Sequence, residues 1–539
     1  MARDLGDFQT PIPLAEEILK SLSSQGKIWT RAIEPTCGKG NFVGSLLEQA
    51  TTFTEIHGIE IQDKYVRQAL RLVNYSPLTK VVIRQANLFD VNLTEELQWN
   101  TTGPLLVIGN PPWVTNSELG SLGSTNLPGK VNLKGLRGID ARTGSSNFDI
   151  AEYIWLKLMK ELASEKPTIA MLCKTSVARN VLHYAYKESL PIAHASIRKI
   201  DAKKWFGAAV DACLFQIEVG SEECRYEAAV YKDLNATKPD SVISISNGHL
   251  VADSLAHNQN FSMRSGESSI IWRQGLKHDA ASVMELTYNA ENALQNKLGE
   301  DVIVEPDSVY PLLKGSDLFH YTENRTKRAV IVTQKKIGED TRHLEQTAPQ
   351  LWIYLTRHRQ AFENRKSSIY NGQPPFAIFG IGDYSFAPYK VAISGLHKIP
   401  RFRAIGPVDD RPVMLDDTCY FIPCTNAKQA AILASLLNDP ACLDYIKSIF
   451  FVDAKRPITK KLLQRIDLAS LFNLIEKQSL MTNVQIELER MEAIAEFQEL
   501  EKLVVEDFLF EYKSIATSLD AQQSRVQIQE LPFSWLTVS

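Results

Sequence analysis

The chain has 539 residues, 44% of them hydrophobic and 23% charged, with a formal net charge of −4. This length favours two or three domains, and the charge excludes a protein that attracts polyanions through its overall field. No apolar run approaches the ~20 residues that cross a bilayer, no signal peptide is expected, and seven cysteines without CxxC or Cys/His spacing predict a reduced cytoplasmic protein with no metal site.

Strand-like apolar runs alternate with helical patterns through the first 220 residues. Such alternation predicts an α/β fold with a mostly parallel, doubly wound, Rossmann-like sheet. The last two strands are close in sequence, and we expect them to form an antiparallel pair at the edge of the sheet. The expected strands are 30–34, 55–60, 80–84, 105–109, 168–173, 193–201 and 212–219, and the expected helices are 13–22, 41–50, 64–74 and 148–162.

A glycine-rich turn joins the first expected strand to the second helix. Residues 33–42 read Ile-Glu-Pro-Thr-Cys-Gly-Lys-Gly-Asn-Phe, so a carboxylate ends the strand and two glycines open the helix. Glycine lets the backbone approach a ligand closely, and a helix N-terminus favours negative groups. A dinucleotide site is one interpretation, which Gly38 and Gly40 alone fit poorly because Glu34 precedes them. That acid suits a cationic amino acid moiety instead, and a purely structural turn remains the alternative.

Polar residues also follow the next two expected strands. Glu60 ends the second strand, where an acid commonly accepts hydrogen bonds from ribose hydroxyls. The third strand is followed by Ala-Asn-Leu-Phe-Asp, residues 86–90, in which Asn87 or Asp90 suits an exocyclic amine and an apolar neighbour suits a ring; each is equally compatible with a simple turn. Before the first helix, Thr10 fits a helix cap, a ligand contact, or both.

The fourth expected strand runs directly into Asn110-Pro111-Pro112-Trp113. This tetrapeptide places an amide side chain, a stiff backbone carbonyl and an aromatic face at the end of a buried strand. Two acceptors beside an aromatic face can hold a planar amino group. A core position for Trp113 is the alternative.

The rest of the chain changes character in steps. Residues 114–147 form a long polar stretch with little periodicity, which predicts a functional loop or a solvated insertion. Residues 226–270 are polar and irregular and are expected to connect two domains. Residues 271–470 mix short strands and turn signals, which predicts a mixed α+β domain, and residues 471–539 have helical spacing.

The motifs occur in one order: Phe8-Gln9-Thr10-Pro11, the glycine turn, Glu60, Asn87, then Asn110 to Trp113. This order resembles the gamma class of adenine-N6 DNA methyltransferases, of which the TaqI-type enzyme is the familiar example. The resemblance covers about residues 5–220. It implies a catalytic domain over residues 1–225 that binds S-adenosylmethionine and methylates an adenine flipped out of double-stranded DNA.

A weaker resemblance continues through residues 271–470, where Tyr310–Asp317 and Phe386–Lys390 look like pieces of the specificity domains of such enzymes. It implies that this region is the DNA-recognition domain. The candidate phosphate contacts are Lys335, Lys336, Arg357, Arg359, Lys390, Lys398, Arg401, Arg403, Lys455 and Arg456, and for any single one of them a solvated face is the more common alternative.

The resemblance also implies a role for each matching position. The residues that it assigns to the cofactor are Thr10, Glu34, Pro35, Cys37, Gly38, Gly40, Phe42, Glu60, Ile61, Asn87 and Leu88. The residues that it assigns to the target base are Asn110, Pro111, Pro112, Trp113 and Phe215, with Asn110 and the Pro111 carbonyl as acceptors and the two aromatic rings against the base. The family commonly has Asp where Asn87 stands, which puts that contact in doubt.

The resemblance further implies a monomeric modification enzyme of a restriction–modification system, with a separately encoded endonuclease. The Asn-Pro-Pro-aromatic sequence is shared with RNA and protein-glutamine methyltransferases, which are the first alternative. A non-catalytic DNA-binding protein with a relic pocket is the second.

Overall fold

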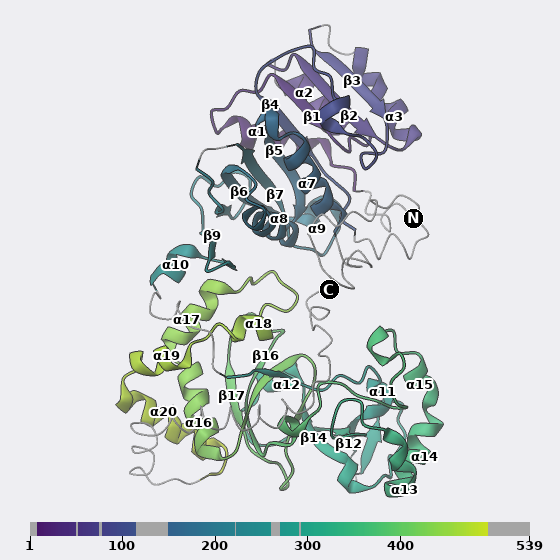
Figure 1. The fold of residues 1–539 in the computed structure, drawn as a ribbon, viewed down its shortest axis with the longest axis vertical. Helices are drawn as coiled ribbons and strands as arrows, with labels where there is room; N and C mark the ends of the chain where they lie inside the picture. Colours follow the sequence, from purple (N-terminus) through teal and green to yellow (C-terminus); the bar gives the residue numbers. More distant parts are fainter. Residues whose placement is uncertain are drawn as a thin grey trace. The chain divides into compact units, whose positions relative to one another are not determined.

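The computed structural model describes residues 8–49, 52–74, 78–114, 149–220, 223–259, 270–289 and 293–493. The chain divides into two compact units, with the boundary after Leu255 (Figure 1). Most of the stretch 114–147 and the chain after residue 493, for which a loop and helices are expected, lie outside these ranges. Within them, no helix combines the length and the apolar character needed to cross a membrane.

A ten-stranded sheet forms the first unit, in the order β10-β9-β8-β6-β7-β5-β4-β1-β2-β3. The strands from β3 to β5 are parallel to one another, and β7 lies antiparallel between β5 and β6. The strand bounds are β1 Arg31–Glu34, β2 Glu55–Glu60, β3 Lys80–Gln85, β4 Leu105–Gly109, β5 Thr168–Lys174, β6 Ile192–Ile200, β7 Ala212–Val219, β8 Ala228–Tyr231, β9 Ser241–Ser246 and β10 His249–Val251. The predicted Rossmann-like doubly wound sheet is confirmed.

The antiparallel pair of β6 and β7 is present, but not at the edge of the sheet. β8 pairs with β6 in parallel, and β9 and β10 add two further antiparallel strands. The residues after 225 were expected to be an irregular connection, yet the sheet continues to Val251. These three strands are only three to six residues long, so their alternation is too brief to reveal them in the sequence.

Helices flank this sheet (Figure 1). One apolar core joins α1 and α2 to the side chains of β1, β2 and β4, because these strands are buried on both faces. The helix bounds are α1 Ile12–Ser23, α2 Asn41–Gln49, α3 Asp63–Ala69, η2 Leu70–Asn74, α4 Leu93–Glu96, α7 Ile150–Glu161, η3 Ala163–Glu165, α8 Thr175–Lys187, α9 Ala202–Phe206 and α10 Ser254–Gln259, the last of which crosses the boundary between the units.

The second unit contains two further sheets, in the orders β11-β19-β16-β17 and β13-β12-β15-β14-β18. All of their pairings are antiparallel except that of β14 with β18. The strand bounds are β11 Arg273–Gln274, β12 Glu285–Tyr288, β13 Leu294–Asn296, β14 Val309–Leu313, β15 Arg328–Ile331, β16 Tyr389–Ser394, β17 Phe402–Ile405, β18 Met414–Leu415 and β19 Cys419–Cys424. This is the mixed α+β architecture that the sequence predicts.

The helices of this unit include the described part of the helical C-terminal segment. α20 packs against α16, and Arg490 near its end donates a hydrogen bond to the Ala404 carbonyl of β17. The segment after residue 470 therefore belongs to this unit at least as far as Ala493. The helix bounds are α11 Ala281–Met284, η5 Pro306–Ser308, α12 Gly315–Phe319, η6 Thr341–His343, α13 Leu344–Thr347, α14 Pro349–Arg357, α15 Arg359–Glu363, η7 Ser368–Tyr370, η8 Asp383–Phe386, α16 Ala427–Leu437, α17 Pro440–Ile449, α18 Lys460–Leu463, α19 Leu468–Leu474 and α20 Lys477–Arg490.

Candidate active site

A cavity of about 360 Å³ lies at the carboxyl ends of β1, β2, β3 and β4. The strand order reverses between β1 and β4, and open α/β sheets bind ligands at such a switch point. The predicted site residues that line the cavity are Thr10, Glu34, Pro35, Cys37, Gly38, Glu60, Ile61, Asn87, Leu88, Asn110 and Pro112. The predicted site residues absent from its lining are Gly40, Phe42, Pro111, Trp113 and Phe215.

The glycine turn fits closely against its surroundings. Gly38 has a φ of +52°, and a Cβ there would lie 2.4 Å from the Gln9 Oε1. Gly40 has a φ of +84°, and a Cβ there would lie 2.8 Å from a methyl carbon of Leu72. Gly38 therefore shapes the cavity wall, whereas Gly40 allows the turn to pack against the following helices. Phe42 is fully buried in the core beneath the turn.

The segment before α1 fastens the glycine turn to the end of β4. The Asn110 Nδ2 donates a hydrogen bond to the Phe8 carbonyl at 2.8 Å. The Lys39 backbone N–H donates to the Gln9 Oε1 at 3.0 Å, and the Asn41 Nδ2 donates to the Thr10 carbonyl at 2.7 Å. Phe8, Gln9 and Asn41 were missed as site residues, although each adjoins a motif that sequence reasoning singled out.

Thr10 does not cap the first helix. Pro11 occupies the N-cap position of α1, with no side-chain cap hydrogen bond. Thr10 is 6% exposed and lines the cavity, so of its two expected positions the structure selects the one beside the ligand site.

Glu34 brings a buried carboxyl group to the cavity. Its Oε2 is buried without a hydrogen-bond partner in the described structure. Burial raises the pKa of Glu34 well above the ordinary 4.5, and the negative charge of Glu60 raises it further. A cation placed here would reverse both effects, because it favours the ionised carboxylate. The cavity is therefore suited to a ligand with a positively charged group at this end.

Glu60 is held in place by the backbone of the same region. Its Oε2 accepts a hydrogen bond from the Gly38 N–H at 2.9 Å, and its Oε1 accepts one from the Gln62 N–H at 2.8 Å. The group is thus oriented before a ligand with hydroxyl donors arrives.

Asn87 uses both ends of its amide within its own turn. The Oδ1 accepts a hydrogen bond from the Phe89 N–H at 3.2 Å, and the Nδ2 donates to the Asp90 Oδ2 at 2.8 Å. This pattern is an Asx turn, which shapes the wall of the cavity. Leu88 supplies an apolar surface there.

Asn110 presents an unused acceptor at the opposite wall. The hydrogen bond from its Nδ2 to the Phe8 carbonyl fixes the amide, and the residue lines the cavity. The Asn110 Oδ1 is buried and has no hydrogen-bond partner among the described atoms. A buried acceptor left in this way costs roughly 1–3 kcal/mol, so its position favours a ligand that donates a proton to it.

Trp113 lies in a cluster of aromatic side chains. Its ring centroid is 5.6 Å from that of Phe8 and 5.1 Å from that of Phe206. The side chain is only 5% exposed, so these two rings cover most of it. Phe206 was not among the expected residues; it ends α9, in the connection between β6 and β7.

Phe215 lies on the other face of the sheet, which differs from its expected place against the same base as Trp113. Its neighbour Leu214 in β7 belongs to the core cluster that contains Trp113. Because side chains alternate along a strand, Phe215 points away from that cluster. Its ring is fully buried, 4.7 Å from the ring of Trp155 in α7. Phe206, by contrast, contacts Trp113 directly.

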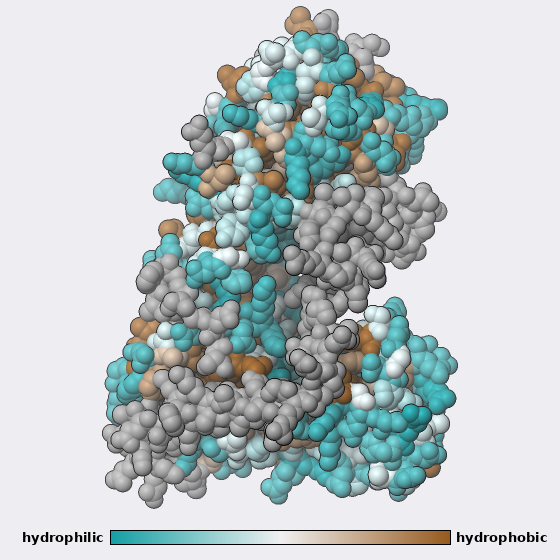
Figure 2. All heavy atoms as spheres, in the orientation of Figure 1, coloured by the Kyte–Doolittle hydropathy of each residue, from teal (hydrophilic) through white to brown (hydrophobic). Residues whose placement is uncertain are grey.

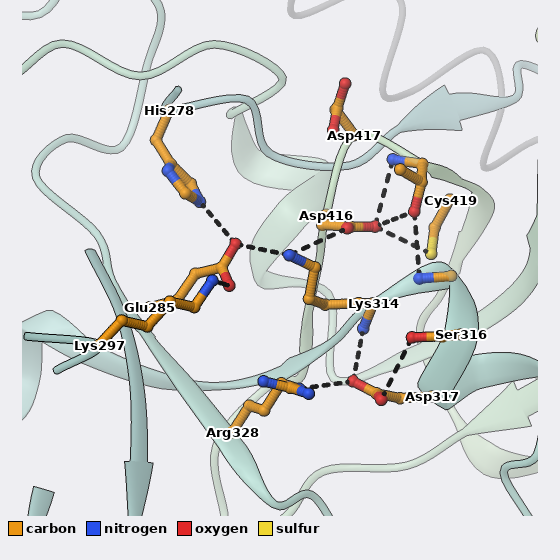
Figure 3. Close-up of polar contacts among 12 residues, drawn as sticks. His278, Glu285, Lys297, Lys314, Ser316, Asp317, Arg328, Asp416, Asp417 and Cys419 are labelled. Carbon is orange, nitrogen blue, oxygen red and sulfur yellow. Dashed lines mark hydrogen bonds and ion pairs between the residues drawn. The ribbon is translucent and has the colours of Figure 1, made fainter. Parts of the chain in front are cut away.

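Several motifs of the second unit serve its internal packing. Lys314 and Asp317, from the segment that resembles a specificity domain, belong to a polar network centred on Glu285 (Figure 3). Lys390 is 1% exposed and donates to the Ala387 carbonyl at 2.7 Å, which contradicts its expected role as a phosphate contact. Arg456 is paired with Asp417 at 3.1 Å.

Other basic residues of the second unit are on its surface. Lys335, Lys398 and Arg401 are exposed. The visible face of the region that contains α13, α14 and α15 is largely hydrophilic (Figure 2). A solvated face and a polyanion-binding face both have this composition, so hydropathy alone does not identify a partner.

Comparison with known proteins gives one close relative. No protein-family model matches the chain. The type II methyltransferase M.NspV of Nostoc sp. (strain ATCC 29411 / PCC 7524) is 39% identical over 473 residues, which are 88% of this chain and 98% of that protein.

Solved structures show more distant similarity. The type IIL restriction–modification enzyme MmeI in complex with DNA has 14% identity and a TM-score of 0.46, over 94% of this chain and 76% of MmeI. A putative class I S-adenosylmethionine-dependent methyltransferase of Listeria monocytogenes has 14% identity and a TM-score of 0.28, over 42% of this chain and 67% of its own.

Proposed function

This chain belongs to the type II methyltransferases and uses S-adenosylmethionine, and on that premise we propose that it methylates the N6 amino group of an adenine flipped out of duplex DNA. The proposal includes a modification role in a restriction–modification system, with a separately encoded endonuclease, and a cytoplasmic location. The single observation that carries the choice of substrate atom is the unpaired, buried Oδ1 of Asn110 beside the cofactor cavity.

The cavity residues fit the cofactor from end to end. Glu34 holds the ammonium group, since its buried carboxyl lacks a partner at one oxygen. Glu60 accepts hydrogen bonds from the ribose hydroxyls, and Ile61 and Leu88 contact the adenine ring from the walls that they line. When bound, the cofactor supplies an activated methyl group on a sulfonium, so the protein needs little acid–base chemistry.

Asn110 and Pro111 act on the amino group of the target. The nitrogen of an aromatic amine is a weak nucleophile, because its lone pair is delocalised into the ring. When its two N–H groups donate hydrogen bonds to the Asn110 Oδ1 and to the Pro111 carbonyl, the nitrogen becomes more pyramidal and its lone pair more available; one of the two N–H protons leaves once the methyl group has been transferred. Phe8 contributes indirectly, because its carbonyl fixes the orientation of the Asn110 amide. Positioning and preorganised acceptors thus provide the catalysis.

The aromatic cluster holds the extruded base. Flipping a base out of the stack costs a few kcal/mol, and stacking on an aromatic side chain returns ~1–3 kcal/mol. Trp113 is covered by Phe8 and Phe206, so the base displaces one of these rings when it enters. Phe8 is the less buried of the two and lies on the short segment before α1. We therefore assign the displacement to Phe8, and we assign Phe206 the role of the second ring against the base.

The alternatives make different predictions about the substrate. An RNA or protein-glutamine methyltransferase shares this pocket and has no use for the second unit on duplex DNA, and a non-catalytic DNA-binding protein transfers no methyl group. The purified chain should be incubated with labelled S-adenosylmethionine and, in turn, duplex DNA, RNA and protein, and the modified product hydrolysed to monomers. We expect label on duplex DNA only, recovered as N6-methyladenine. Label on methylcytosine, RNA or glutamine would refute the proposal.

A further inference from the structure

A compact group of aromatic and cationic side chains lies where the β16–β17 connection meets the end of α12. The connection spans residues 395–401, between Ser394 and Phe402. We refer to the group as the β16–β17 patch, and its members are Phe319, His397, Lys398, Ile399, Arg401 and Arg403.

The patch is ordered by contacts among its own members. The rings of Phe319 and His397 are stacked, with centroids 4.0 Å apart and planes 10° from parallel. The Arg401 guanidinium lies 5.3 Å from the centroid of the Phe319 ring. Arg403 donates a hydrogen bond from Nη2 to the Phe319 carbonyl at 3.3 Å. The cations are therefore held in one arrangement on an aromatic platform.

Hydrogen bonds at the start of α12 hold the helix that carries Phe319 in place. The Asp317 Oδ2 accepts hydrogen bonds from the Lys314 N–H at 3.3 Å and from the Arg328 Nε at 3.0 Å (Figure 3). The Gly315 N–H donates to the Thr418 Oγ1 at 3.1 Å. These contacts fix the short helix at the junction of the two sheets, which explains why the segment resembling a specificity domain is turned inward.

The charge of the patch is positive and largely uncompensated. Residues 394–408 contain Lys398, Arg401 and Arg403 and no acidic residue. Arg490 of α20 adds a fourth cation close to Arg403, and burial together with the charges of Arg401 and Arg490 lowers the pKa of Arg403. The nearby acid, Glu487, is paired with Arg490 at 2.8 Å. Like charges crowded in this way are stabilised by a polyanion.

An apolar side chain stands among the exposed cations. Ile399 is 63% exposed and lies between Lys398 and Arg401 in sequence, while Pro400 is buried and restricts the backbone beside it. Proteins that bind the DNA minor groove frequently insert an apolar side chain such as isoleucine between base steps. A protein partner with an apolar surface would not require three cations without acids.

We propose that the β16–β17 patch is a DNA-contacting element of the second unit, in which Lys398 and Arg401 bind phosphates and Ile399 packs in the groove between them. This inference rests on the proposed function, since it takes duplex DNA as the substrate. It adds which surface of this unit the duplex meets.

The test compares two charge-matched double variants of the full chain. Lys398→Gln with Arg401→Gln removes two patch cations, and Lys366→Gln with Lys461→Gln removes two exposed lysines elsewhere in the same unit. Binding to a fluorescent duplex that carries the site found by sequencing methylated host DNA is measured by anisotropy between 50 and 200 mM salt. The urea unfolding transition of the second unit, which contains all four positions, checks that each variant is folded there.

We expect the patch variant to bind at least ~10-fold more weakly, with a salt slope shallower by roughly 2, since each phosphate contact contributes ~0.9. The control variant should stay within about threefold of the unaltered chain. Equal losses in both variants, or an unchanged slope in the patch variant, would overturn the inference while leaving the proposed function standing. Failure of the unaltered chain to bind or methylate duplex DNA would reject the proposed function itself.

A third variant separates the groove contact from the charges. Ile399→Ser should weaken binding to the specific duplex by roughly three- to tenfold without changing the salt slope, because an apolar contact releases no counterions. Unchanged affinity in this variant would remove Ile399 from the interface. A changed slope would show that the substitution alters phosphate contacts and that the assigned division of roles is wrong.

Discussion

The cavity of the first unit and the Glu285 network of the second unit differ in how their buried polar groups are paired. Around the cavity of the first unit, one oxygen of Glu34 and one of Asn110 are buried without a hydrogen-bond partner in the described structure. In the network of the second unit, Glu285 is 4% exposed and binds Lys297 at 2.6 Å and Lys314 at 2.8 Å. Both groups are buried, yet only the network satisfies its own charges.

This difference separates a binding site from a scaffold. An unpaired buried acceptor lowers the stability of the free protein by roughly 1–3 kcal/mol. A protein tolerates this loss at a position where a bound ligand pairs the acceptor. A buried ion pair whose members bind each other needs no ligand. Asn110 in the cavity and Lys314 in the network are both polar residues next to glycine in the sequence. Residue type alone therefore does not distinguish the site from the scaffold. The pairing in three dimensions does.

The largest expected effect comes from removing the unpaired acceptor. Asn110→Ala should lower kcat for methyl transfer by at least ~10³-fold, because one N–H of the target amino group then has no preorganised oxygen to which it can donate a hydrogen bond. Cofactor affinity should change by no more than a few-fold. Labelled methyl transfer at saturating cofactor, combined with calorimetry, measures both.

A paired amide provides the control for that substitution. Asn296 is 3% exposed, and its amide binds the Tyr354 hydroxyl and neighbouring backbone groups. Asn296→Ala should destabilise the second unit by roughly 1–3 kcal/mol and leave kcat per folded molecule unchanged. If Asn110→Ala retained turnover while Asn296→Ala lost it, the distinction between site and scaffold would be reversed.

The next largest effect is expected on the free energy of unfolding of the second unit when the Glu285 network is broken. Glu285→Gln leaves Lys314 and Lys297 without their shared carboxylate; because the lysine side chains are 29% and 43% exposed, we expect a cost of only about 1–2 kcal/mol. Urea unfolding should show this loss in the transition of the second unit, with cofactor binding to the first unit unchanged. Loss of cofactor binding together with an unshifted transition would mean that the network serves the site.

A smaller effect distinguishes the two phenylalanines. Phe206→Ala removes a ring that contacts Trp113, whereas Phe215→Ala removes a ring on the opposite face of the sheet. Only the first should reduce the fluorescence of 2-aminopurine placed at the target position, by the loss of ~1–3 kcal/mol of stacking. The second should lower stability by 3–5 kcal/mol through its cavity. Reduced extrusion in Phe215→Ala, measured on folded protein, would restore the sequence-based assignment.

Local patterns predicted the first unit well, because its motifs lie where parallel strands end. Glu34, Glu60 and Asn110 are far apart in sequence, yet a doubly wound sheet brings the ends of their strands to one edge. The predicted cavity lining followed from that rule. The resemblance gave Phe215 because an aromatic residue was expected near β7, but a choice between Phe206 and Phe215 depends on which face of the sheet each side chain takes.

The second unit was less predictable from sequence for a physical reason. Its strands are short and antiparallel, with pairings such as β11 with β19 that join residues about 150 positions apart. Lys390 reads as a surface cation, although its long aliphatic stem allows burial against Phe421. Long-range pairing decides which charges are satisfied, and that pairing leaves no local pattern.

The subtlest consequence of the Glu34 carboxyl, whose Oε2 lacks a partner in the described structure, is a dependence on pH. The pKa of Glu34 in the folded chain is raised by burial, so between 4.5 and that higher pKa the folded state retains a proton that the unfolded state has lost. The free energy of unfolding of the cofactor-free chain should therefore fall as pH rises through this window. A bound ammonium group favours the carboxylate and opposes the fall, so cofactor affinity should increase with pH over the same range.

Glu34→Gln should bind S-adenosylmethionine roughly tenfold more weakly and lose both trends, which thermal unfolding and calorimetry from pH 5 to 7 can follow. Parallel pH profiles for Glu34→Gln and the unaltered chain would show that Glu34 has a partner in the free protein, and the contrast between the two units would then rest on Asn110 alone.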